Sequence, residues 1–298
     1  MTRRQRTIAV RVHVLVLSAL VVSTPLVGAP QESPMAKPQP GKGEPGADSE
    51  SLREAARIIA AVDLEISTGD AWGKVKQIEK PLLLYGDLTR DNDRGSLWAW
   101  GEKGRPVALL ELFQDTVNRQ KWLFAVCNTS GSKLRGRWVD APWWGENTSA
   151  TEPRDIPGAP PPAATTAQRQ RQMKQLAQKF AGHEFWDPNN TRYDLRLLDR
   201  PLHTYRDEAA GLLDGGLFTF ANGTNPEIML YIEARVSPND KTKTVWQYAT
   251  GRLAHAELHL AYNGKELFTA PRADSSISDR ELPYWLGFFT VTPGLLPK

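Results

Sequence analysis

Three side chains that can bind metal ions alternate along one short segment of this chain. His255, Glu257 and His259 are separated by single residues, so on a β-strand all three would project from the same face. Imidazole and carboxylate groups are ligands of Zn²⁺, so the pattern is compatible with a metal site. Polar alternation is also typical of a strand with a solvated outer face, and we favour that interpretation. We expect no metal and no other cofactor.

A tyrosine and an aspartate recur two positions apart, as Tyr85 with Asp87 and as Tyr205 with Asp207. On a strand, each pair would share a face and could donate a proton or bind a polar ligand. In the alternative interpretation, the aspartate caps the following turn while the tyrosine packs over the sheet edge. We favour the structural role, because an aspartate just after a strand is ordinary turn chemistry.

Residues for nucleophilic catalysis are not evident in the sequence. It contains no nucleophile elbow, phosphate-binding loop or dinucleotide fingerprint, and His183 with Glu184 begins no two-histidine metalloprotease motif. The single cysteine, Cys127, has no partner for an intramolecular disulfide and ends an apolar segment. We expect it to act as a small hydrophobic residue, and we predict no catalytic residue.

Aromatic residues offer the remaining chemistry, since ten tryptophans are many for 298 residues. Trp143 and Trp144 follow a proline, and Tyr284 and Trp285 follow another near the C-terminus. Paired aromatic residues on loops can stack on sugar rings or anchor a partner protein. They can also plug the open end of a sheet, which is the interpretation we favour. If the four residues do bind a ligand, we predict that they form one partly exposed platform.

The sequence that carries these candidates repeats itself. An offset of 120 residues, without a gap, aligns residues 81–113 with 201–233 and gives eight identities in 33 positions. Average composition would give roughly two. An offset of 124 then aligns Trp122 with Trp246, which we predict to be buried in equivalent places. We infer a tandem duplication.

The repeat weakens the metal hypothesis. The counterparts of the three candidate ligands are residues of other chemistry, namely Gly131, Lys133 and Arg135. Leu258 and Leu134 lie on the opposite face of the two segments. The face that carries the candidate ligands is therefore polar in both copies, but it is rich in metal ligands only in the second.

Periodicity predicts one helix followed by about five antiparallel strands in each copy, which is an α+β fold. Helices are expected from residue 49 or 51 to about 62, and over 166–181. Alternating apolar residues after Pro106 and Pro226 predict a sheet covered on one face. The predicted strands are 74–86, 95–101, 106–114, 120–127 and 133–139, then 192–206, 215–221, 227–236, 244–250, 255–262 and 265–269.

The chain divides by composition into six parts. Residues 1–29 read as a signal peptide or anchor, because Arg3, Arg4, Arg6 and Arg11 precede an apolar run. Few apolar residues occur in 30–49, which we predict to be a disordered tether. The first repeat covers 50–145, a proline-rich connector 146–164, the second repeat 165–270 and a C-terminal extension 271–298.

Removing the N-terminal segment leaves 33 basic and 34 acidic residues, a formal charge of −1. This balance lacks the basic excess expected of a nucleic-acid-binding protein, so we predict no nucleic-acid partner.

Four segments carry a resemblance: PGAPPPAATTAQRQRQMKQLAQKF, LRLLDRPLHTY, LLDGGLFTFANGTNPEIMLYIEA and WQYATGRL. Over about 50–270 the chain resembles a family of exported proteins of unknown function associated with planctomycete bacteria. The resemblance implies export, but no activity, cofactor or site residue.

The sequence therefore predicts an exported, non-enzymatic binding or structural module, periplasmic or secreted, or held at the membrane by an uncleaved N-terminal segment. Its expected partner is a protein or polysaccharide of the cell envelope. The alternative is a hydrolase acting on cell-envelope or extracellular polymers, with acid and base residues that only the fold brings together.

Overall fold

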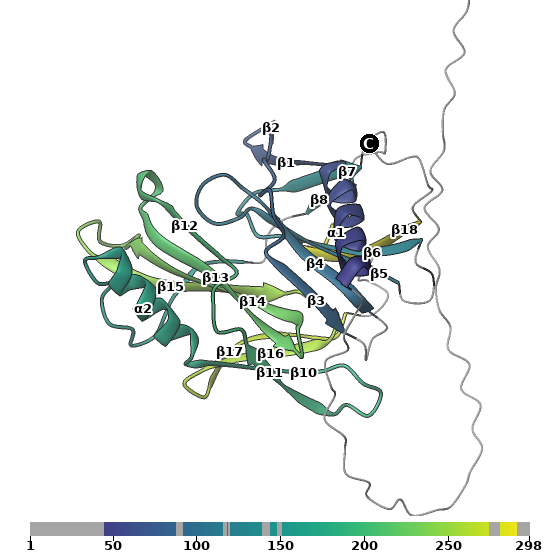
Figure 1. The fold of residues 1–298 in the computed structure, drawn as a ribbon. Helices are drawn as coiled ribbons and strands as arrows, with labels where there is room; N and C mark the ends of the chain where they lie inside the picture. Colours follow the sequence, from purple (N-terminus) through teal and green to yellow (C-terminus); the bar gives the residue numbers. More distant parts are fainter. Residues whose placement is uncertain are drawn as a thin grey trace, which may run out of the picture.

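The computed structural model describes residues 45–87, 92–115, 118, 120–138, 144–147, 151–273 and 281–290. The predicted signal peptide or anchor (1–29) and most of the predicted tether lie outside these residues. The described part is mainly antiparallel sheet with two α-helices, which confirms the α+β class (Figure 1). None of its helices is long and apolar enough to span a bilayer.

The N-terminal half contains helix α1 and two sheets. α1 spans Pro45–Ala60, so it begins inside the segment that was predicted to be a disordered tether. The smaller sheet has the order β2-β1-β7-β8, formed by β1 (Val62–Thr68), β2 (Ala71–Lys74), β7 (Leu134–Trp138) and β8 (Trp144–Asn147). The larger has the order β18-β6-β5-β4-β3, formed by β3 (Leu83–Asp87), β4 (Asn92–Trp100), β5 (Ala108–Gln114), β6 (Lys121–Asn128) and β18 (Tyr284–Thr290).

The C-terminal half contains helix α2 (Thr166–Ala177) and one nine-stranded sheet. The order is β17-β16-β10-β11-β13-β14-β15-β9, with β12 paired to β13. The strands are β9 (Arg154–Asp155), β10 (Phe180–Phe185), β11 (Arg192–Leu197), β12 (His203–Asp207), β13 (Leu212–Asn222), β14 (Asn225–Val236), β15 (Thr244–Arg252), β16 (Glu257–Tyr262) and β17 (Lys265–Ala270), and a short 3-10 helix, η2 (Glu208–Ala210), follows β12.

Both helices end earlier than their apolar spacing predicts, because a strand follows each at once. α2 starts after Thr165, whose side chain accepts a hydrogen bond from the Gln168 backbone N–H, and it ends at Ala177 instead of 181. Phe180 then enters the core from β10, and Val62 begins β1 in the same way after α1. Among the predicted strands there is no counterpart of β1 or β10, nor of the short strands β8 and β9.

The two halves pair their strands in matching registers. Tyr85 lies opposite Gly95 and Tyr205 opposite Gly215, and a bulge follows the tyrosine in both cases. Farther on, Trp122 pairs with Gln114 and Trp246 with Ala234, positions that correspond at the two offsets found in the sequence. Trp122 and Trp246 are 1% and 2% exposed, so both are buried as predicted.

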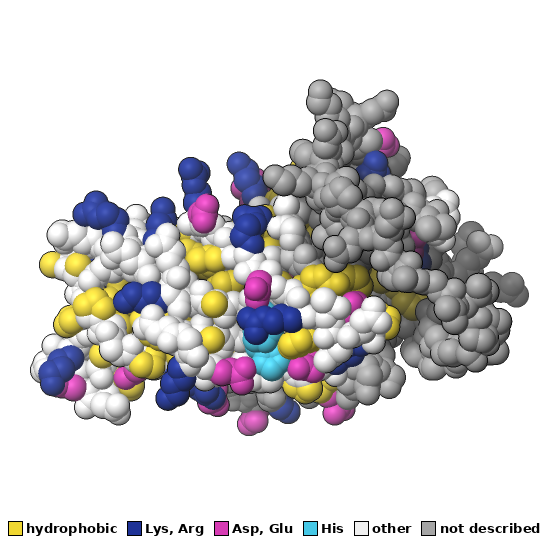
Figure 2. Space-filling model, turned by 90° about the horizontal axis from the view of Figure 1, so that it is seen from below, with side chains coloured by type: hydrophobic (Ala, Val, Ile, Leu, Met, Phe, Trp, Pro, Cys, Tyr) yellow, Lys and Arg dark blue, Asp and Glu magenta, His cyan; other side chains and the backbone are white. Residues whose placement is uncertain are grey.

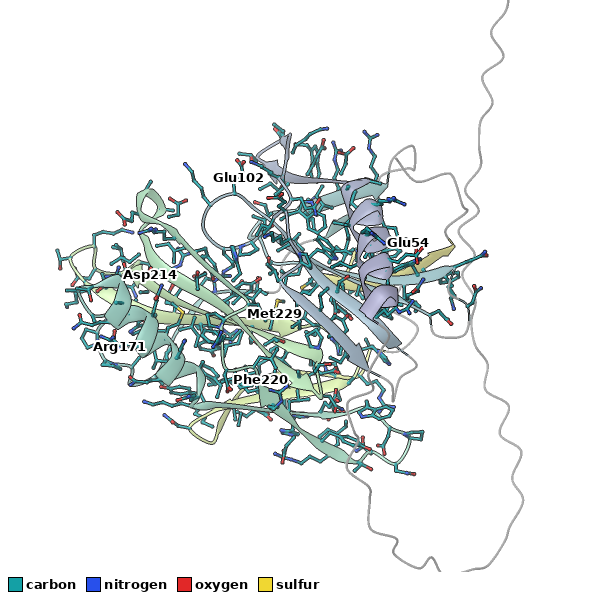
Figure 3. The ribbon with its side chains drawn as sticks, in the orientation of Figure 1. Glu54, Glu102, Arg171, Asp214, Phe220 and Met229 are labelled. Carbon is teal, nitrogen blue, oxygen red and sulfur yellow. The ribbon has the colours of Figure 1, made fainter. Side chains whose placement is uncertain are left out.

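Three apolar cores hold the layers together. The first core lies under α1 and includes Ile58, Ile59, Trp98, Trp122 and Trp285. The second core lies under α2 and includes Met173, Leu176, Phe218, Phe220 and Trp246. The central core joins the two large sheets and includes Leu97, Leu109, Cys127, Tyr205, Leu217, Met229, Tyr231 and Tyr284. The helices lie on opposite outer sides, with Met229 between the sheets (Figures 1 and 3).

The central core corrects the expectation of sheets covered on one face. Glu111 on β5 and Tyr231 on β14 lie opposite the alternating apolar residues, on the face that was expected to be uncovered, and they are 3% and 0% exposed. Because the back of each large sheet packs against the other, the central strands are buried on both faces.

The predicted C-terminal extension (271–298) contains a strand of the N-terminal half. β18 pairs antiparallel with β6 over seven positions, from Tyr284 opposite Cys127 to Thr290 opposite Lys121. Trp285 enters the first core, where its ring meets Phe124 edge-on at 5.2 Å. The N-terminal half is therefore completed by residues that follow the entire C-terminal half.

We predict that Trp285→Ala lowers the free energy of unfolding by about 3–5 kcal/mol, since it leaves a large cavity in the first core. Urea denaturation measures the change. Leu84→Ala is the control, because Leu84 on β3 is 55% exposed and its loss should change stability by less than about 0.5 kcal/mol. Equal effects of both substitutions would contradict the packing described for β18.

Candidate functional site

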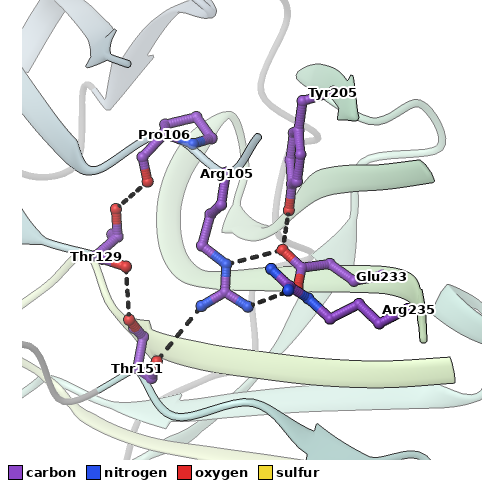
Figure 4. A network of polar contacts seen from close by, with 7 residues as sticks. All are labelled: Arg105, Pro106, Thr129, Thr151, Tyr205, Glu233 and Arg235. Atoms are coloured by element: carbon purple, nitrogen blue, oxygen red, sulfur yellow. Dashed lines mark hydrogen bonds and ion pairs between the residues drawn. The ribbon is translucent and has the colours of Figure 1, made fainter. Parts of the chain in front are cut away.

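A buried ion pair lies where the two halves meet. Arg105, in the loop between β4 and β5, donates from Nε to Glu233 Oε1 at 2.8 Å and from Nη2 to Glu233 Oε2 at 2.9 Å. Arg235 Nε donates to Oε2 at 2.6 Å, and the Tyr205 hydroxyl donates to Oε1 at 2.8 Å (Figure 4). Glu233 is 0% exposed, and its two oxygens accept four hydrogen bonds.

Further contacts tie three chain segments to this pair. Arg105 Nη1 donates to the backbone carbonyl of Thr151 at 3.4 Å, and the guanidinium lies 4.8 Å from the ring centre of Tyr231. The Thr151 hydroxyl donates to the Thr129 carbonyl at 3.1 Å, and the Thr129 hydroxyl donates to the Pro106 carbonyl at 2.5 Å. The network therefore joins loops of the N-terminal half to β12 and β14 (Figure 4).

The surroundings fix the charge of each member of the network. Burial alone raises the pKa of Glu233, but Arg105 and Arg235 outweigh it and bring the pKa below the ordinary value of 4.5. Burial raises the pKa of Tyr205, and the negative charge of Glu233 raises it further. Glu233 is thus an anion near neutral pH, and Tyr205 is a neutral donor.

The recurring tyrosines have structural partners. Tyr85 donates to Glu111 Oε1 at 3.1 Å, much as Tyr205 donates to Glu233. Each ring covers a glycine, since a Cβ at Gly95 or Gly215 would lie 2.3 Å from the tyrosine Cε2. Asp207 caps η2 by accepting a hydrogen bond from the Ala210 backbone N–H, as predicted for this turn. The side chain of Asp87 lies outside the described residues.

Cys127 is buried in the central core. Burial raises the pKa of its thiol far above the ordinary value, and the charge of Glu111 adds to the effect. The thiol therefore stays protonated and packs as a small hydrophobic group, as predicted.

Two of the four predicted platform residues are buried. Tyr284 is 7% exposed and Trp285 is 2% exposed, and both lie on β18 instead of on a loop. Trp143 and the side chain of Trp144 lie outside the described residues. Tyr284 and Trp285 therefore present no exposed rings, because β18 carries one into the central core and the other into the first core.

The predicted polar strand face contains a stacked histidine pair. His183 on β10 lies opposite His259 on β16, with ring centres 4.5 Å apart and an interplanar angle of 5°. Glu257 Oε1 lies 3.0 Å from His259 Nε2, and Glu266 Oε2 lies 2.8 Å from Nδ1. Figure 2 shows histidine side chains at the surface among acidic and basic side chains. We name this cluster the histidine face.

The two stacked rings differ in their affinity for a proton. Burial alone lowers the pKa of His259, but Glu257 and Glu266 raise it above the ordinary 6.5. Burial, Arg192 and the neighbouring ring of His259 lower the pKa of His183. A protonated His259 can donate to both carboxylates, so one shared charge links β16 to β17.

The histidine face has a counterpart of other chemistry in the N-terminal half. Glu65 on β1 lies opposite Arg135 on β7, and Arg135 Nη2 donates to Glu65 Oε2 at 2.6 Å. The ring of Trp72 covers this guanidinium at 4.2 Å. Leu134 and Leu258 are both fully buried on the opposite face, as predicted. Among the described residues, no group of three or more His, Cys, Asp or Glu side chains is arranged to hold a metal ion.

Sequence reasoning missed the ion pair at the centre of the molecule, because 128 positions separate its members. One signal was available: Glu233 interrupts the apolar run of β14, and a carboxylate inside a doubly buried strand requires buried hydrogen-bond donors or a cation.

Comparison with known proteins identifies no relative. No family model, no curated protein and no solved structure matches the chain.

We predict that Arg105→Met destabilises the protein by about 3–5 kcal/mol near pH 7, because it leaves the buried carboxylate short of its main cation. The pKa of Glu233 is lowered in the folded state, so its contribution is present above pH 4.5 and is lost as the pH falls through the folded pKa. The stability difference between the two proteins should therefore shrink in acid, as measured by urea denaturation at several pH values.

Arg192→Met is the matched control, because Arg192 pairs with Asp194 at the surface with 58% of its side chain exposed. We expect a change below about 1 kcal/mol. A similar loss in both variants would refute the structural importance assigned to the central pair.

Proposed function

We propose that this chain is an exported, non-enzymatic module that binds or organises a protein or polysaccharide of the cell envelope. The observation that carries the proposal is the saturation of Glu233. A carboxylate has about four acceptor positions, and here Arg105, Arg235 and Tyr205 supply four donated hydrogen bonds. Glu233, the buried carboxylate of this network, is thus committed to holding the halves together.

Export is supported by the N-terminal sequence, in which four arginines precede an apolar run. An exported chain with a single buried cysteine relies on its cores for stability. The packed sheets provide these cores, and the histidine face lies on two paired strands of one of them.

We also propose that the two halves arose by tandem duplication of a unit with one helix and an antiparallel sheet. Three observations support it. Strand pairs match in register at the sequence offsets, as in Trp98 opposite Leu110 and Phe218 opposite Leu230. The helix leads directly into a strand in both halves. A tyrosine ring covers a glycine at the same position in each.

The duplication predicts matched costs for Gly95→Ala and Gly215→Ala. Each new methyl group would overlap the adjacent tyrosine ring, so both variants should lose about 1–3 kcal/mol of stability. Gly73→Ala is the control, since nothing lies within 4 Å of a Cβ there. Thermal unfolding measures all three. A large loss in one variant and none in the other would show that the two sites are not equivalent.

The proposed function is tested by incubating the purified full-length chain with an insoluble cell-envelope fraction. We expect the chain to sediment with the envelope and to release no soluble fragments. Trp143→Ala/Trp144→Ala asks whether these two tryptophans contribute to retention, with Leu84→Ala as the control. Failure to sediment would reject envelope binding. Release of soluble fragments by the wild-type chain would instead support the hydrolase alternative.

A further inference from the structure

β18 differs from the other strands in how it reaches its sheet. It begins 156 residues after β6 ends, yet it forms the edge next to β6 and fills two cores at once. Trp285 enters the first core and Tyr284 the central core. Until β18 pairs with β6, the edge of β6 is therefore unpaired and both cores are incomplete.

The C-terminal half closes the equivalent edge with a segment that precedes it in the chain. There β9 pairs with β15, and the backbone N–H of Ile156 donates to the carbonyl of Trp246 at 2.8 Å. β9 lies just before α2 in the sequence, so the segment that covers this edge is already synthesised when β15 is made. The N-terminal half instead depends on a strand from the far end of the chain.

The edge of β6 is selective for the sequence of β18. Gly287 lies opposite Phe124, and a Cβ at position 287 would come within 2.5 Å of the Phe124 ring. A strand that docks here needs a glycine at this register, with large apolar residues on both sides of it. A second copy of this chain carries such a strand, whereas an arbitrary extended peptide does not.

We propose that the β6 edge of one molecule accepts β18 of a second copy, giving a strand-exchanged homodimer in which every core is complete. The exchanged form contains the same strand contacts as the monomer, so protein concentration during folding sets the balance between them. The acceptor edge is synthesised well before the donor strand, which favours capture of a neighbour's strand when copies fold close together. This inference is independent of the proposed function.

The test uses two full-length variants in a Cys127→Ser background. Leu123 and Phe288 lie opposite each other across β6 and β18 and are partly exposed, so one variant carries Leu123→Cys and the other Phe288→Cys. A disulfide between the two proteins requires β18 of one molecule on β6 of the other. We expect the mixture, refolded together and oxidised, to give a covalent heterodimer on a non-reducing gel that increases with concentration.

Two controls make the outcome decisive. Replacing Leu123→Cys by Leu84→Cys, on the opposite edge strand β3, should give no heterodimer. Adding Gly287→Val to the Phe288→Cys variant should abolish the cross-link. Equal cross-linking in the Leu84→Cys mixture would overturn the proposal. So would light scattering that detects only monomer after the wild-type chain is refolded over the same concentrations.

Discussion

The rest of this structure depends on the burial of two sheets against each other, back to back. β14 is buried from Pro226 to Ala234, and β5 is buried at every position except Phe113. Any charged group on such a strand must find its counterion inside, since an unpaired buried charge costs several kcal/mol. Glu233 meets this requirement with Arg105, which comes from the other half of the chain. The central core makes the contact between the halves apolar, and the ion pair makes it specific.

The same constraint explains the aromatic content. Each half has one helix to cover the outer face of its sheet, and the spaces beneath are filled by large rings, including Trp98, Trp122, Phe218 and Trp246. Buried tyrosines bring a hydroxyl into an apolar layer, and buried carboxylates accept hydrogen bonds from two of them, Tyr85 and Tyr205. Of the aromatic residues that suggested binding chemistry, Tyr284 and Trp285 therefore serve packing.

The two halves share a strand framework and carry different chemistry on it. A glycine lies under the tyrosine in both halves, where the ring leaves no room for a Cβ. At a partly exposed cross-strand position, by contrast, one half has Glu65 with Arg135 and the other has His183 with His259.

The sequence by itself determined what local periodicity encodes. It predicted the α+β class, most of the strands, the burial of Trp122 and Trp246 and the capping role of Asp207, because each depends on neighbours a few positions away. Only the tertiary structure decided that β18 returns to β6, that both faces of the large sheets are covered, and that Glu233 pairs with Arg105. These contacts join segments more than a hundred residues apart. They depend on complementary shape and charge in three dimensions, and the local pattern of a sequence does not contain that information.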